Sequence, residues 1–153
     1  MGSDLLIPKD ETAFTLLIEA TSDPESGNLD RVQVIKGWID EAGNTHEKIY
    51  NVAWAGERLL NANGKLPAID TTVDVSMARY DNSKGAPRLA VVWQDPDFSS
   101  QPSFYYVRVL EVRTPRHHAY DAAALGLDAA EANPGKSSTI QERAWSSPIW
   151  VTP

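Results

Sequence analysis

The chain has 153 residues, of which 42% are hydrophobic and 23% charged, proportions typical of one soluble globular domain rather than a disordered chain. Its net charge of −7, with basic residues scattered among acidic ones, disfavours binding to nucleic acid or to anionic membranes. No cysteine is present, which excludes disulfides and thiolate chemistry, and no stretch approaches the ~20 apolar residues of a membrane span. Residues 1–14 lack the basic and apolar regions of a signal peptide.

Short β-forming runs separated by turn residues dominate most of the chain. Residues 13–20 predict a strand that places Phe14, Leu16 and Ile18 on one face. Residues 31–54 predict a β-hairpin. Its turn is expected in the pair Gly43-Asn44, and a bulge or bend is expected near Gly37 in its first strand.

The clearest alternation of apolar and polar residues lies in residues 71–80, which predict a strand with Val73, Val75 and Met77 pointing inward. Residues 88–93 are almost continuously apolar. This run predicts a central strand that is covered on both faces.

Residues 104–112 predict the next strand, in which Tyr105 or Tyr106 is a candidate for a hydroxyl bond back to the backbone. The alanine-rich residues 119–127 predict a short helix, and residues 147–153 predict a last strand. Between them, the run at 140–145 fits neither pattern clearly.

Strands at this spacing predict an all-β, immunoglobulin-like or fibronectin-III-like sandwich with one short helix in a long insertion before the last strand. We expect residues 1–153 to form a single domain. The seven predicted strands span residues 13–20, 31–39, 47–54, 71–80, 88–93, 104–112 and 147–153.

The adjacent pair His117-His118 is the most visible candidate for chemistry. Neighbouring residues point to opposite faces of a strand, or about 100° apart on a helix, so the pair is badly spaced for one metal ion. His46, the third histidine, lies in the predicted hairpin turn. We therefore expect an exposed loop pair, and no catalytic residue or cofactor site is assigned.

Oxygen-rich loops offer weak candidates for calcium ligands, although none has the spacing of a known calcium loop. Turn-forming roles for these residues are the alternative. The candidates are Asp23, Glu25, Asp30, Asp95 and Asp97.

Five tryptophans are many for this length, and Trp54 and Trp93 lie at predicted strand ends. If these two side chains are exposed, they are candidates for a carbohydrate-binding platform. If they are buried, they cover the core.

Several stretches resemble the C-terminal part of a large uncharacterised bacterial family, number 3604 among the domains of unknown function. The most specific is "ERAWSSPIW" at 142–150. The others are "LDRVQVIKGWID", "EKIYNVAWAG", "FYYVRVLEVRTPR" and "YDAAALG". The closing strands are also similar to the terminal sandwich of PHP-type and amidohydrolase-like proteins.

This resemblance implies a longer parent protein, often with an export signal, whose upstream part is a metal-dependent, hydrolase-like domain carrying the metal ligands. The chain would then be a non-enzymatic accessory domain, with the upstream domain as partner and a homodimer through the uncovered patch as a further expectation. The interdomain contact candidates are Tyr120, Trp145 and Trp150, with the excursion at 114–146. A carbohydrate- or other ligand-binding module is the alternative.

Overall fold

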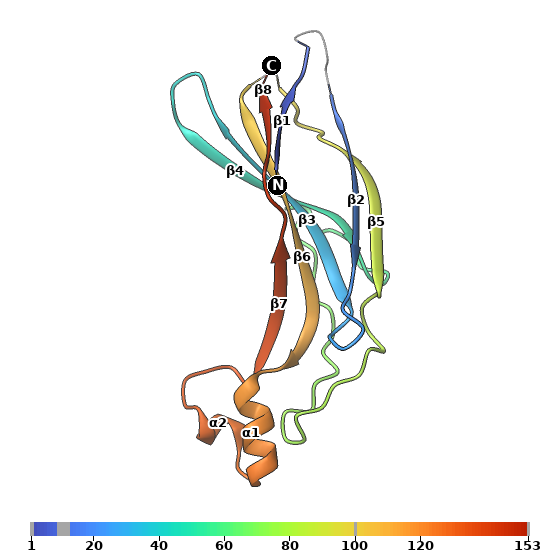
Figure 1. Cartoon of the computed structure of the whole chain (residues 1–153), viewed down its shortest axis with the longest axis vertical. Coiled ribbons are helices and arrows are strands. Elements are labelled where there is room, and N and C mark those ends of the chain that lie inside the picture. Colours follow the sequence, from blue (N-terminus) through green and yellow to red (C-terminus); the bar gives the residue numbers. More distant parts are fainter. Residues whose placement is uncertain (1, 9–12, 100, 153) are drawn as a thin grey trace.

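The computed structural model describes residues 2–8, 13–99 and 101–152. They form an all-β sandwich, which confirms the predicted fold class (Figure 1). A large sheet has the strand order β1-β8-β6-β3-β4, with β7 also paired to β6, and β2 and β5 form a two-stranded sheet that covers one of its faces. The elements are β1 (Ser3–Leu6), β2 (Thr15–Thr21), β3 (Leu29–Ile39), β4 (Thr45–Trp54), β5 (Arg88–Gln94), β6 (Ser103–Pro115), α1 (His117–Leu125), α2 (Ala129–Ala132), β7 (Thr139–Trp145) and β8 (Ile149–Thr152).

The main hydrophobic core lies between the two sheets. Alternate residues of β3 point into it, and Val32 and Val34 are almost completely buried there with Tyr105 of β6. Ile18 of β2 closes the core from the small sheet, as the pattern of residues 13–20 predicts. Burial of these side chains is the main force that holds the sheets together.

The predicted hairpin at residues 31–54 is confirmed as β3 and β4, but the bulge lies elsewhere. The register between these strands shifts at Val32/Gln33 and is regular at Gly37. Glycine is required at position 37 for a different reason, because a Cβ there would lie 2.3 Å from Cζ of Phe104. The Phe104 ring therefore lies directly over the backbone of β3.

The prediction of a strand at residues 71–80 is wrong. The segment is a turn in which the Asp74 carboxylate accepts hydrogen bonds from the backbone N–H groups of Ser76 and Met77. Local side-chain bonds of this kind compete with strand pairing. Ala78, at φ 47°, packs against Ala119 and other alanines of the helices, so tertiary packing fixes the turn.

The run at residues 88–93 forms β5, but it is not a central strand. It pairs with β2 in the two-stranded sheet and buries only its inner face. Leu17 of β2 and Val92 of β5 are opposite each other on the outer face of this small sheet, 80% and 69% exposed. The expectation of cover on both faces is therefore wrong.

The predicted helix is confirmed as α1, which ends at Gly126 in the left-handed conformation (φ 69°). It begins at His117, so both histidines lie in its first turn and the expected loop pair is wrong. A second short helix, α2, follows and packs beside it through alanines. None of the helices in the described part of the chain is long and apolar enough to cross a membrane.

Two strands that were not predicted from the sequence complete the large sheet. The ambiguous run at 140–145 becomes β7, which pairs antiparallel with β6, and β1 pairs parallel with β8 at the edge. The predicted last strand is confirmed as β8, with Val151 buried and Trp150 exposed.

Candidate functional site

The large sheet has a second face, which points away from β2 and β5; we call it the outer face. Across β8, β6 and β3, the residues Trp150, Phe104 and Gly37 are paired in one row. Their neighbours Val151 and Tyr105 are buried in the core, so this row points outward.

A groove of about 600 Å³ follows this row. We call it the aromatic groove and define it by Ile39, Phe104 and Trp150. The rings of Phe104 and Trp150 lie 5.3 Å apart, centre to centre, while Ile39 is 56% and Trp150 51% exposed. Apolar side chains on a sheet are normally covered, so this exposure marks a contact surface.

A polar ladder crosses the middle of the outer face. Arg108 donates from Nε to Oε1 of Gln33 at 2.9 Å, and Nε2 of Gln33 donates to Oδ1 of Asn51, also at 2.9 Å. Trp145 of β7 pairs with Arg108 in the sheet register and is 59% exposed. The ladder separates the aromatic groove from the helical end of the molecule.

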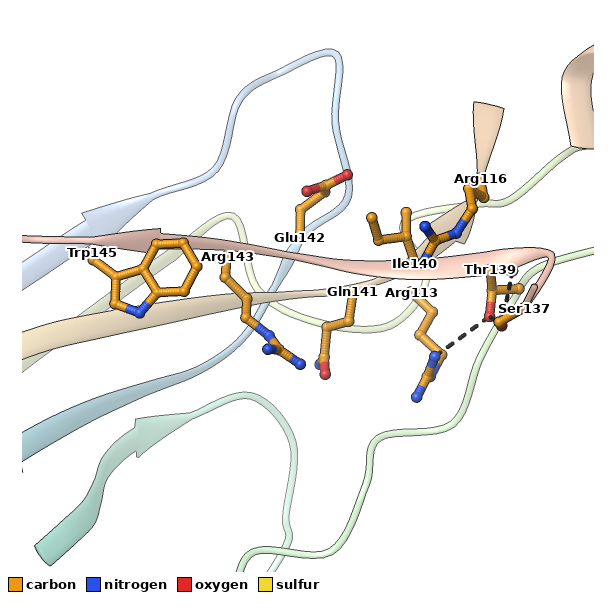
Figure 2. A pocket seen from close by; sticks show the side chains of 9 residues that line it. All are labelled: Arg113, Arg116, Ser137, Thr139, Ile140, Gln141, Glu142, Arg143 and Trp145. Carbon is orange, nitrogen blue, oxygen red and sulfur yellow. Dashed lines mark hydrogen bonds between the residues drawn. The ribbon is translucent and has the colours of Figure 1, made fainter. Parts of the chain in front are cut away.

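Toward that end, β6 and β7 carry a second pocket of about 420 Å³, shown in Figure 2. We call it the arginine pocket and define it by Arg113, Arg116 and Arg143. Arg113 and Arg143 lie on the same side of β7 as Gln141, and Trp145 stands at one end of the pocket (Figure 2). In the described residues, no ion pair joins any of the three guanidinium groups to a carboxylate.

The inner side of the large sheet holds a buried polar network. Nζ of Lys36 donates to Oδ2 of Asp95 at 2.6 Å, and the hydroxyl of Tyr105 donates to the same oxygen at 2.7 Å. Burial, together with this hydrogen bond to a carboxylate, raises the pKa of Tyr105 well above its usual range. The Tyr105 hydroxyl thus bonds a side chain and not the backbone, which corrects the sequence prediction; Tyr106 points to the outer face.

The neighbouring Asp97 extends this network toward solvent. Its carboxylate accepts hydrogen bonds from Lys48 and from the Tyr50 hydroxyl, the latter at 2.8 Å. The bond from Lys48 is the main reason that the pKa of Asp97 is lowered. Burial and the bond to Asp97 raise the pKa of Tyr50.

Asp30 is completely buried and forms a separate network. Its carboxylate pairs with Arg31 at 2.9 Å and with Arg58 at 2.7 Å, and it accepts a hydrogen bond from Gln141 of β7 at 3.0 Å. These contacts tie β3 to the loop that follows β4 and to β7. A carboxylate engaged in this way is a structural anchor.

The structure does not gather the five calcium candidates into one cluster. Asp30 lies in its own network, Asp95 and Asp97 share another, and Asp23 accepts a hydrogen bond from the backbone N–H of Glu25 within a turn. Within residues 2–8, 13–99 and 101–152, no group of three or more histidine, aspartate or glutamate side chains is placed to hold a metal ion.

The three interdomain contact candidates are all exposed but lie apart. Trp150 lines the aromatic groove, Trp145 lines the arginine pocket, and Tyr120 lies on α1 with 44% exposure. The other two tryptophans considered as a carbohydrate platform are half-buried: Trp93 packs in the core, and Trp54 donates from Nε1 to the carbonyl of Arg58.

The histidines do not meet either. His117 is exposed on α1, whereas Nε2 of His118 is buried without a hydrogen-bond partner among the described residues. His46 lies on β4, opposite Trp38, so its predicted place in the hairpin turn is wrong. It pairs with Asp40 of the turn at 2.8 Å, which lowers the pKa of that carboxyl.

The arginine pocket was not foreseen from the sequence. Its residues are far apart in the chain, and they come together only because β7 pairs with β6, opposing Leu110 to Arg143 and Arg113 to Gln141. The available signal was the alternation Gln141, Arg143, Trp145, which places three large side chains on one face of a strand.

Searches of curated proteins and of solved structures found no match to this chain. A family model, described as a protein of unknown function (DUF3604), matches residues 1–153. The chain therefore belongs to the DUF3604 family.

Proposed function

We propose that this chain is a non-enzymatic, immunoglobulin-like accessory domain that packs against an upstream domain of the same polypeptide through its aromatic groove. The observation that carries the proposal is the exposure of Ile39 and Trp150 around the Phe104 ring on an otherwise well-formed sheet. Leu6, on the edge strand beside β8, extends this apolar surface and is 78% exposed. Covering these side chains would remove a large apolar area from water.

The position of β1 supports an upstream partner at this face. Gly2 lies against Pro148, just before β8, so a segment preceding it would emerge near Trp145. A preceding domain would then be near both the groove and the polar ladder. The resemblance to PHP-type and amidohydrolase-like proteins supports a metal-dependent hydrolase as that domain, with catalysis and the metal ligands belonging to it.

Oxidative footprinting of the parent protein tests this role. Trp150 should be oxidised freely in the isolated domain and be protected in the full-length polypeptide. Met77 is the matched control, since it is 54% exposed in the turn near α1 and away from the groove, and should react equally in both. Equal oxidation of Trp150 in the two proteins would contradict the proposal.

The same surface predicts self-association when it is uncovered. The isolated domain should form a concentration-dependent homodimer, and Trp150→Glu should shift it to the monomer in analytical ultracentrifugation. Leu17→Glu, a change on the small sheet, should leave the association constant unchanged. Loss of the dimer in both variants would show that the contact is not the groove.

A second candidate function is carbohydrate binding at the same groove. The observation that favours it is the outward row of Trp150, Phe104 and Tyr106, in which the last two rings are nearly parallel at 10°. A panel of neutral glycans would then quench tryptophan fluorescence saturably, and Trp150→Ala would abolish the effect. A silent panel removes this candidate and leaves the docking role untouched.

A further inference from the structure

We propose that the arginine pocket binds a tetrahedral oxyanion, the sulfate or phosphate group of a small ester, between Arg113 and Arg143. This inference concerns a different surface from the aromatic groove and does not depend on the docking role proposed above.

The first argument is charge. The protein has 21 acidic against 14 basic residues, so guanidinium groups have many possible carboxylate partners. Asp30 takes Arg31 and Arg58, and Glu19 takes Arg88. In the described residues, the other five arginines have no carboxylate partner, and three of them, Arg113, Arg116 and Arg143, line one small concavity.

The second argument is that the available donors face the pocket unused. Arg113 makes only a long contact of 3.4 Å to the Thr139 hydroxyl. Arg116, whose Nε is buried without a partner among the described residues, lies on the other side of β7 (Figure 2). Each guanidinium offers a fork of N–H donors that suits oxyanions. Thr139 and Ser137 add hydroxyl groups at the same end of the pocket (Figure 2).

The one carboxylate that lines the pocket does not neutralise it. Glu142 lies between Gln141 and Arg143 in the strand, so its side chain points to the other face of β7. Figure 2 shows this carboxylate on the side opposite Arg113 and Arg143. The nearer polar neighbour, Gln141, is held by bonds from its Nε2 to Asp30 and to the carbonyl of Glu111. These bonds engage its amide nitrogen, so Gln141 adds no free donor to the pocket.

The geometry of the donors selects the shape of the anion. Arg113 comes from β6, Arg143 and the Thr139 hydroxyl from β7, and the Ser137 hydroxyl from the turn before β7, so donors reach the pocket from three segments. A tetrahedral group with three terminal oxygens can accept from all of them, whereas a planar carboxylate offers two oxygens. Trp145, at the open end, presents an exposed apolar ring to the carrier of the ester.

Calorimetric titration of the domain at low salt tests the proposal. Glucose phosphate and glucose sulfate are the two ester probes, and glucose, inorganic phosphate and inorganic sulfate are the reference ligands. At least one ester should bind saturably and weaken as salt is added, while glucose should not bind. The stronger of the two esters identifies which oxyanion the pocket prefers.

Variants locate the binding. Arg113→Gln and Arg143→Gln should each weaken ester binding about tenfold or more, since each removes a charge-assisted donor set. Arg88→Gln, an exposed arginine of the small sheet, is the matched control and should bind as the unmodified protein does. Trp145→Ala should weaken the ester but leave the inorganic anion unchanged. Unchanged melting temperatures identify the variants that remain folded.

Two results would overturn the inference. One is the absence of saturable binding by every anion at low salt. The other is binding that survives both glutamine variants, or that falls equally in Arg88→Gln, because either pattern reports general charge attraction. If one glutamine variant fails to fold, Arg113→Lys replaces it: this keeps the charge but loses the planar fork, and should still weaken binding.

Discussion

The ammonium group of Lys36 and the carboxylate of Asp95 lie 2.6 Å apart in the core, with only 4% and 0% of their side chains exposed. The two residues join strand β3 to the loop after β5, and so connect the large sheet to the small one. The hydroxyl of Tyr105 and the carbonyl of Asp97 complete the hydrogen bonds of the pair.

We predict that Lys36→Met lowers the free energy of unfolding by about 3–5 kcal/mol, because it leaves Asp95 buried without its counter-charge. Urea denaturation measures this. The double variant Lys36→Met, Asp95→Asn should lose less than the sum of the single variants, since neither charge then remains.

The matched control is Lys48→Met in the exposed pair with Asp97, where both side chains are about half exposed. Surface pairs contribute about 0–1 kcal/mol, so this change should have little effect. Equal losses in Lys36→Met and Lys48→Met would show that burial does not govern these pairs.

A second prediction concerns the contact between Gly37 and Phe104. Gly37→Ala should lower the free energy of unfolding by about 1–3 kcal/mol, because the added methyl group cannot share space with the aromatic ring. Phe104→Leu, combined with Gly37→Ala, should restore part of that loss. Gly37→Ala alone, measured without any loss in chemical denaturation, would mean that the ring moves away freely.

Tyr105, which is buried, and Tyr50, which is partly buried, predict a loss of stability in alkaline solution. The folded-state pKa values of Tyr50 and Tyr105 are raised above the unfolded value of about 10. Their contribution is therefore fully present below about pH 10 and is lost as the pH rises from there toward the folded-state pKa values.

Urea denaturation between about pH 9 and 11 measures this decline. Tyr105→Phe should be less stable at neutral pH, since a buried hydrogen bond is lost, and should show a shallower alkaline decline. Tyr106→Phe is the matched control and should keep the full decline. A decline that is unchanged in Tyr105→Phe and in Tyr50→Phe would contradict the assignment.

Calcium is predicted not to stabilise the domain. Arginines hold Asp30 and a lysine holds Asp95, so calcium would have to displace buried cations. The melting temperature should stay the same when calcium is added to the metal-free protein. A saturable rise that Asp97→Asn abolishes would instead establish a site in the loop after β5.

The sequence predicted those elements whose pattern reflects burial by the sandwich itself. Residues 13–20 alternate because one face meets the core, and the hairpin at 31–54 is marked by β-forming runs on both sides of the turn pair Gly43-Asn44; both are confirmed. The helix before Gly126 follows from alanines and a C-terminal glycine. In each case local preference and tertiary packing agree.

The wrong predictions concern segments whose conformation or pairing is determined by tertiary contacts. Residues 71–80 alternate like a strand, yet Asp74 organises a turn and Ala78 packs under α1. The apolar run of β5 resembles a central strand, but Val92 remains in water. Pairing partners cannot be deduced from either run, because they depend on residues distant in the chain.

The candidate sites also divide into one that local sequence predicts and one that depends on strand pairing. Trp150 was identified because neighbouring residues of a strand point to opposite faces, so Trp150 points outward where Val151 points inward. The arginine pocket depends on the pairing of β6 with β7, whose register shifts between Leu110 and Arg113. A register shift of this kind leaves no clear mark in the sequence, and so neither did the pocket.

The pairing of the small sheet determines where the protein opens locally. In the described residues, β2 and β5 pair only with each other, and an isolated bridge between Leu29 and Ala86 fastens the start of β5 to the large sheet. Amide hydrogens of β2 and β5 should therefore exchange with solvent before those of β3 and β6. Local opening about that bridge, rather than global unfolding, would then set how often Val34 and Tyr105 meet water.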